Sequence, residues 1–242
     1  MLNNHPFAVD AFFERSVVLT YAYPAANLRS LLPVMLELDT LDETTAFVAA
    51  ALVRTRSLRP KGFPKMFGND FFLIGYRAFV KFINSAGKRR RGLYILGSRT
   101  DSPRLKFFGN IFTQYDYSLI DVEETHSGLQ TRVFSRAEGL DVSYQIADDE
   151  VELPNGSPFT TWKEARRYAG PLPFTFTCEP NSKKVLVIEG VRENWQPKPV
   201  KVIEHRVEFF DKLAVGEGVL ANAFAVENIP YRWEKGRIET AA

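Results

Sequence analysis

Three segments with the alternating pattern of β-strands carry a charged or titratable side chain on an otherwise apolar face. In KVIEHRVEFF, His205 shares a face with isoleucine, valine and phenylalanine. In KVLVIEGVR, Glu189 shares a face with three valines, and in FFLIGYRAFVKF, Arg77 shares one with leucine and phenylalanine. Burying an unpaired charge is costly, so each of these side chains needs a partner or a polar cavity. Such a cavity could be a small-molecule site.

The segments that carry Glu189 and His205 are joined by ENWQPKP, which is centred near Gln196. In an antiparallel hairpin the numbers of paired residues have a constant sum, here near twice the number of that centre. Glu189 then lies opposite Ile203 or His205, and both registers put Glu189 and His205 on one face. We therefore expect the two side chains to share a cavity. The alternative is that each is a satisfied core residue, which is the commoner situation for a lone inward histidine.

Other charged or nucleophilic motifs lack the spacing that their chemistry needs. The run Lys88–Arg91 lies in an expected hairpin turn, where charge is usually solvated, and Asp148–Glu152 lacks the pattern of a calcium loop. The three histidines form no zinc-binding pair, and Ser98 lies outside a Gly-x-Ser-x-Gly motif. We therefore expect no metal, no cofactor and no serine nucleophile.

The composition is that of a globular protein with many aromatic residues. The chain has 242 residues, 45% of them hydrophobic, and includes 20 Phe, 9 Tyr and 3 Trp. A formal net charge of +2 gives no reason to expect nucleic acid or a membrane surface as partner. One cysteine, Cys178, rules out an intrachain disulfide and favours a reducing compartment. With neither a signal-peptide pattern nor a membrane-spanning apolar run, we expect a cytoplasmic protein.

About eleven strands and two or three short helices are needed to position these residues. The helical segments are 25–33, 102–112, where Ser102 and Pro103 suit the N-terminus of a helix, and 160–170. The strand-like segments are 15–23, 45–58, 71–83, 91–100, 115–124, 129–137, 140–147, 173–179, 183–193, 200–210 and 219–233. This order predicts an α+β domain with a mostly antiparallel sheet that is closed or nearly so.

The first half of the chain resembles the acetoacetate decarboxylase family. SVVLTYAYPAANLRSLLPVMLELD follows that family's order of strand, short helix, proline and loop, GLYILGSRTDSP resembles its next strand, and GNIFTQYDYSLIDV resembles the segment with its catalytic lysine pair. The likeness is clearest over residues 12–125. It implies a closed, cone-like β-barrel or double sheet around a buried cavity, as a single domain over residues 1–242.

The resemblance also implies that the chemistry of that family is missing here. The positions of its lysine pair correspond to about Tyr117 and Ser118, neither of which can form a Schiff base. Its catalytic glutamate falls within 73–77, which contains no carboxylate, and its substrate-binding arginine corresponds to Glu14. The pattern resembles an uncharacterised branch of the superfamily in which a Pro–Tyr-like dipeptide, here Asp116–Tyr117, replaces the lysines.

Two functions are consistent with these observations. In the first, the chain binds, or acts by an unknown reaction on, a small organic acid or ketone in its cavity. The candidate ligand-binding residues are Arg77, Tyr117, Glu189 and His205. In the second, the chain is a structural or interaction protein whose cavity is filled by aromatic side chains such as Phe71, Phe79 and Phe224. The sequence leaves open whether the chain is an enzyme and whether it forms a homo-oligomer.

Overall fold

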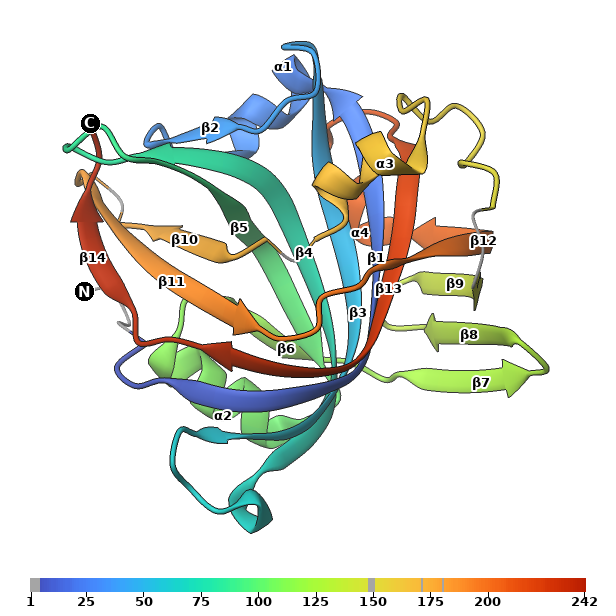
Figure 1. The fold of residues 1–242 in the computed structure, drawn as a ribbon, viewed down its shortest axis with the longest axis horizontal. Helices are drawn as coiled ribbons and strands as arrows, with labels where there is room; N and C mark the ends of the chain where they lie inside the picture. The colour runs from blue at the N-terminus through green and yellow to red at the C-terminus, as the bar shows by residue number, and fades with distance from the viewer. Residues whose placement is uncertain (1–4, 148–150, 171, 180) are drawn as a thin grey trace.

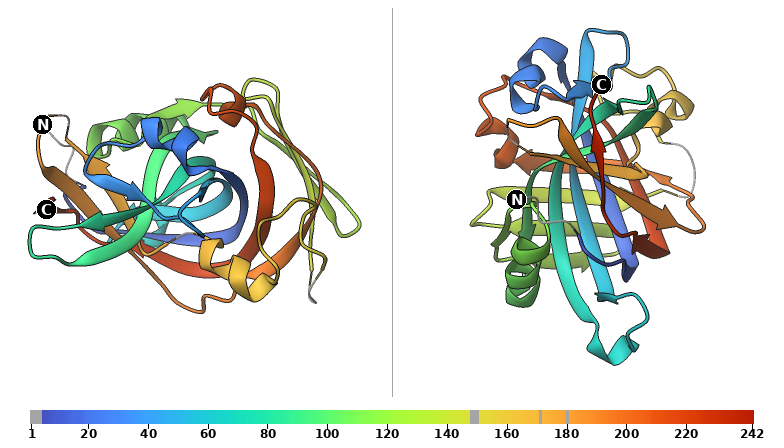
Figure 2. Two further views of the ribbon diagram at one scale, coloured as in Figure 1. Left: turned by 90° about the horizontal axis from the view of Figure 1, so that it is seen from above. Right: turned by 90° about the vertical axis from the view of Figure 1, so that its left-hand side faces the viewer.

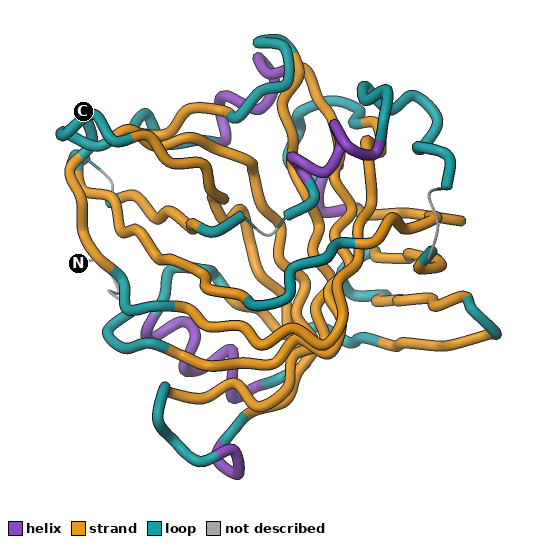
Figure 3. The backbone as a smooth tube through the Cα atoms, in the orientation of Figure 1, coloured by secondary structure: helices purple, strands orange, loops and turns teal. Residues whose placement is uncertain are grey.

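The fold is a large, mostly antiparallel sheet with a few short helices. The computed structural model describes residues 5–147, 151–170, 172–179 and 181–242. Part of the acidic run Asp148–Glu152 lies outside these ranges. Strands account for most of the described backbone (Figure 3). The α+β, mostly antiparallel class expected from the sequence is confirmed.

Five long strands form the centre of the sheet. They are β1 (Val9–Pro24), β3 (Thr45–Pro60), β4 (Asn69–Ile83), β5 (Arg89–Thr100) and β13 (Val219–Trp233). Strand β3 is buried over most of its length, and its central alanines have exposed fractions of 1% or less. Alanine is a good helix former, but here small side chains allow apolar layers to pack closely on both faces of the strand.

The sheet returns on itself as a ring of hydrogen-bonded strands. Strand β5 pairs in parallel with β10 (Phe174–Cys178), and β10 pairs with β11 (Lys184–Arg192). Strand β11 then pairs with β13, with Gly190 opposite Trp233, so that the order β11-β10-β5-β4-β3-β1-β13 closes. Figure 1 and the left view of Figure 2 show how the sheet curves round on itself.

The remaining strands extend the sheet or pair at its sides. Strand β13 continues into a four-stranded arm, at the right of Figure 1, made of β12 (Lys198–Val207), β9 (Leu140–Ile146), β8 (Gln130–Ser135) and β7 (Glu123–Ser127). The other added strands are β2 (Leu36–Leu38) on β4, β6 (Tyr117–Leu119) on β5, and β14 (Arg237–Thr240) on β11.

The expected hairpin between 183–193 and 200–210 is wrong. Strand β11 pairs with β10, β13 and β14, whereas β12 pairs with β13 and β9. Two prolines just before the second segment, Pro197 and Pro199, lack the amide hydrogens that a ladder with β11 would require. The chain therefore crosses from the ring into the arm at this point.

Short helices cover the ends of the ring. They are α1 (Ala25–Leu28), α2 (Pro103–Phe112), α3 (Trp162–Ala165) and α4 (Glu208–Asp211), with single 3-10 turns at Arg29–Leu31, Lys65–Phe67 and Arg166–Tyr168. The sequence correctly predicts the start of α2, where the Ser102 hydroxyl accepts a hydrogen bond of 3.2 Å from the Leu105 amide. In the part of the chain that is described, no helix has both the length and the apolar composition needed to span a membrane.

Apolar clusters lie on both faces of the central strands. On β4, Tyr76 belongs to one cluster and stacks on Phe209, with 3.7 Å between ring centroids. Leu73 and Phe79 belong to the other cluster, against which Tyr117 packs. Arg77 has the parity of Leu73 and Phe79, so its side chain lies on the face that lines the interior of the ring.

Candidate functional site

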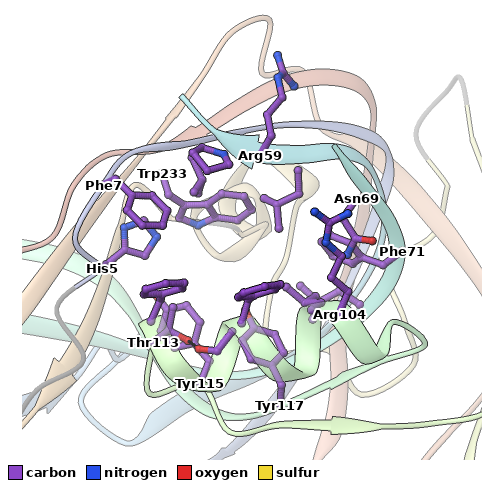
Figure 4. A pocket seen from close by; sticks show the side chains of 18 of the residues that line it. His5, Phe7, Arg59, Asn69, Phe71, Arg104, Thr113, Tyr115, Tyr117 and Trp233 are labelled. Carbon is purple, nitrogen blue, oxygen red and sulfur yellow. Dashed lines mark hydrogen bonds between the residues drawn. The ribbon is translucent and has the colours of Figure 1, made fainter. Parts of the chain in front are cut away.

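A pocket opens at one end of the ring, beside α2. Its volume is about 300 Å³. Most of its lining is aromatic or aliphatic, including Phe71, Leu73, Phe108, Phe112 and Trp233. In Figure 4 the labelled side chains surround a central opening, with Trp233 across it from Tyr117. Such a concave, apolar site with a few polar groups is the usual form of a small-molecule site.

Arg77 is not one of the residues that line this pocket, but it lies beside Tyr115 and Tyr117, which do line it. Arg77 is only partly exposed and its Nε is buried, and the titratable groups around it are the phenols of Tyr115, Tyr117 and Tyr231. Within the described ranges Arg77 forms no hydrogen bond and no ion pair, and its buried Nε has no partner. Burial lowers the pKa of Arg77 from 12.5, but a guanidinium remains a cation at neutral pH. The site therefore has an uncompensated positive charge.

Gly75 determines the direction in which Arg77 points. A Cβ added at Gly75 would come within 2.8 Å of Nε and Nη2 of Arg77. The guanidinium thus runs back along β4 over Gly75, toward Leu73, which lines the pocket. Because Gly75 has no side chain, the Arg77 guanidinium can lie over it on the inner face of the sheet.

Helix α2 positions Tyr117. The Tyr117 amide donates to Oδ1 of Asn110 at 2.8 Å, and Nδ2 of Asn110 donates to the Tyr117 carbonyl at 3.0 Å. The Tyr117 ring lies against Gly109, where an added Cβ would be 2.5 Å from two ring carbons. Asp116 has φ of 49°, a turn that directs both Tyr115 and Tyr117 into the pocket lining.

The tyrosines around Arg77 are neutral hydrogen-bonding groups. Burial raises the pKa of Tyr115, Tyr117 and Tyr231 above the ordinary value of 10, and Arg77 opposes this only in part. The buried Tyr115 hydroxyl lies near Thr175 but forms no hydrogen bond of standard geometry with the described residues. Phenols in this state can donate to an oxygen atom of a ligand.

A second partly buried arginine lies beyond Tyr231. The Arg192 guanidinium lies 4.2 Å from the centre of the Trp195 ring, and its buried Nη1 has no hydrogen-bond partner in the described structure. Burial lowers the pKa of Arg192, and Tyr231 is the group whose charge favours its ionised form. Tyr231 therefore stands between two cations.

Of the four candidate residues from the sequence, the structure brings Arg77 and Tyr117 together. Glu189 has the opposite parity to Leu186 and Ile188, which pack toward Tyr115. Its carboxylate instead forms an ion pair with Arg237 at 3.4 Å and is partly exposed. The expectation that Glu189 and His205 face each other fails with the hairpin on which it rests.

His205 lies in the arm rather than in the ring. It is on β12 opposite Val142 of β9, and its Nδ1 is 3.1 Å from the Tyr21 hydroxyl. The residue is exposed, and the partial burial of its ring lowers the pKa of His205 from 6.5. Among the ranges that the structure covers, no group of three His, Cys, Asp or Glu side chains could hold a metal ion.

Sequence reasoning missed Tyr115, Tyr231 and Arg192. Strand parity does not explain the first, because Tyr115 precedes β6 and the turn at Asp116 brings it beside Tyr117. Arg192 likewise shares its parity on β11 with Leu186 and Ile188. Tyr231 follows Pro230 in the last long strand, and only the pairing of β13 with β11 places it in the ring.

The fold is that of acetoacetate decarboxylase-like proteins. The chain is similar to an acetoacetate decarboxylase from Legionella pneumophila, with 14% identity, 95% of this chain and 86% of that chain covered, and a TM-score of 0.57. It is similar to an acetoacetate decarboxylase-like enzyme from Sphingomonas wittichii RW1, with 9% identity, 98% and 94% covered, and a TM-score of 0.54. The resemblance inferred from the sequence is confirmed at the level of fold.

A third solved structure with this fold is the enduracididine biosynthesis enzyme MppR, complexed with the condensation product of pyruvate and imidazole 4-carboxaldehyde. The identity is 11%, with 96% of this chain and 89% of that chain covered and a TM-score of 0.59. No curated protein sequence matches the chain. The chain belongs to the DUF2071 family, described as an uncharacterized conserved protein, whose model matches residues 11–239.

Proposed function

We propose that the chain binds a small organic acid, or a ketone that carries a carboxylate, inside the ring of strands, with its carboxylate on Arg77. The observation that supports this most is the partly buried guanidinium of Arg77, which has no anionic partner among the described residues. Leaving a buried charge unpaired destabilises a fold, so this arrangement is favourable only when an anion completes it.

The surrounding groups suit a carboxylate. An arginine can donate two parallel hydrogen bonds to the two oxygens of a carboxylate, and Nε and Nη2 of Arg77 both lie over Gly75, which has no side chain. The Tyr115 and Tyr117 hydroxyls can donate to the same ligand from the side of α2. The proposed site therefore keeps Arg77 and Tyr117 and takes Tyr115 and Tyr231 in place of Glu189 and His205.

The proposal does not include decarboxylation through a Schiff base. That mechanism needs an amine in the pocket, and the described residues that line the pocket include no lysine.

The alternative, a structural protein with a filled cavity, has one supporting observation. Phe79 packs edge-on against Phe47 and Tyr168 and fills the far end of the same apolar cluster. Phe71, however, lines an open pocket of about 300 Å³. The open pocket favours ligand binding over this alternative.

A cytoplasmic location and a single domain over residues 1–242 stay predictions. The location rests on the lone Cys178, whose thiol is free in the structure. The single domain rests on the one sheet that joins the strands of both halves of the chain.

Titration calorimetry with butyrate and 2-oxobutyrate tests the proposed function. We expect binding to the unmodified chain and a loss of about 10- to 100-fold in affinity in Arg77→Gln, which keeps size and polarity but removes the charge. Arg206→Gln is the matched control, because Arg206 is exposed and pairs with Glu208 on the surface of the arm. Equal affinity in the Arg77 variant and the unmodified chain would refute the proposal.

A further inference from the structure

We infer that the ligand is a carboxylate with an apolar tail, whose head lies at Arg77 and whose tail occupies the pocket beside α2. This inference rests on the proposed function and deepens it by naming the substrate class. A tail of several carbons or a phenyl ring is required, because a bare acid of two or three carbons would leave the pocket filled with water against apolar walls.

The direction of Arg77 supports this arrangement. Its guanidinium lies over Gly75, and the next residues on the same face of β4 toward the opening are Leu73 and Phe71, both of which line the pocket. Each pair of residues along a strand advances about 7 Å. The path outward from the cation therefore passes along apolar side chains over the length of a medium-chain acid.

The opposite walls of the path are apolar as well. Phe108 and Phe112 of α2 line it, and so does Trp233 of β13, which lies across the opening from Tyr117 in Figure 4. Arg59 and Arg104 also line the pocket, and in Figure 4 their long side chains extend to its edge. The pocket thus has an apolar middle, and Arg77 lies beside the tyrosines of its wall, an arrangement that matches an acid with a tail.

A series of straight-chain acids tests the inference. Affinities of acetate, butyrate, hexanoate and octanoate are measured by titration calorimetry, with 3-phenylpropionate as the aromatic member. We expect affinity to rise by about fourfold per added methylene until the pocket is full. A flat series would overturn the tail while leaving the anion site of the proposed function intact. Absence of binding by every acid would overturn both.

Two neighbouring phenylalanines on α2 provide a matched pair of variants. Phe108 lines the pocket, whereas Phe107 does not line it and is 62% exposed. We expect Phe108→Ala to lower the affinity for octanoate by about tenfold and to leave the affinity for acetate unchanged, because only the tail of the acid contacts this ring. Phe107→Ala should change neither affinity. Equal losses in the two variants, or a loss for acetate as large as for octanoate, would contradict the inference.

Discussion

The guanidinium of Arg77 occupies the space above the α-carbon of Gly75, two residues earlier on the same strand. An added Cβ at Gly75 would be 2.8 Å from Nε and Nη2 of Arg77, closer than non-bonded atoms can approach. The two residues therefore depend on each other. Because Gly75 has no side chain, the guanidinium of Arg77 can lie over it, on the face of β4 that carries Leu73 of the pocket lining.

Gly75→Ala should displace Arg77 and lower the affinity for a carboxylate ligand. The added methyl group overfills a buried site, so we expect the free energy of unfolding to fall by about 1–3 kcal/mol. In an Arg77→Leu background, Gly75→Ala should lower the free energy of unfolding clearly less, because the shorter leucine side chain does not reach Gly75. Urea unfolding of the four proteins of this cycle measures the coupling. Additive effects would show that the two residues do not contact each other as described.

Removal of Arg77 should stabilise the ligand-free chain. Arg77→Met takes an unpaired charge out of the interior, and we expect the free energy of unfolding to rise by about 1–3 kcal/mol. Arg90 is the matched control. It is also an arginine of the sheet and is only 8% exposed, but it forms an ion pair with Glu239 at 2.6 Å. Arg90→Met should destabilise by about 1–3 kcal/mol, because it takes a buried ion-pair partner from the partly buried Glu239 carboxylate. Changes of the same sign in both variants would contradict our description of Arg77.

Gly109→Ala should destabilise the chain although it lies inside a helix. Alanine normally stabilises a helix interior by about 0.5–1 kcal/mol over glycine. Here its Cβ would lie 2.5 Å from the Tyr117 ring, so the ring or the helix must move. We expect a loss of stability in thermal unfolding, and its reversal when Tyr117→Ala makes room. A gain in stability from Gly109→Ala alone would mean that Tyr117 is not held against α2.

Stability should fall between pH 7.5 and pH 5.5 through His5. Burial lowers the pKa of His5 below its ordinary value of 6.5, and the pKa of His205 is lowered in the same way. As the pH falls through 6.5, the unfolded chain takes up protons that the folded chain does not, so acid favours unfolding. The carboxylates with lowered pKa, such as Glu239, titrate below about pH 4.5 and do not contribute here. Urea unfolding at both pH values should show a smaller loss for His5→Phe than for the unmodified chain; an identical loss would exclude His5.

Local features of the fold could be predicted from the sequence, and long-range pairing could not. The start of α2 follows from Ser102 and Pro103 because a capping hydroxyl and a proline act within one turn of the helix. The partners of β11 depend on how seven strands close into a ring, which is a property of the whole chain. A hairpin between sequential strands is the simplest assumption, and it fails where two prolines begin the second strand.

The same limit explains why only part of the candidate site was predicted. Arg77 and Glu189 both alternate with apolar residues, but the strands that carry them have an apolar cluster on each face. Alternation indicates that a side chain is on an apolar face without indicating which of the two faces it is. Arg77 faces the interior of the ring, whereas Glu189 faces the other side and reaches Arg237.

The most direct test of the central claim is a crystal structure of the chain with 6-bromohexanoate. We expect the carboxylate to lie about 2.7–2.9 Å from the Arg77 guanidinium. The anomalous signal of the bromine should mark the tail between Phe108 and Trp233, both of which line the pocket. A structure in which the acid binds elsewhere, or in which the bromine lies at Arg77 and the carboxylate at the opening, would contradict the account.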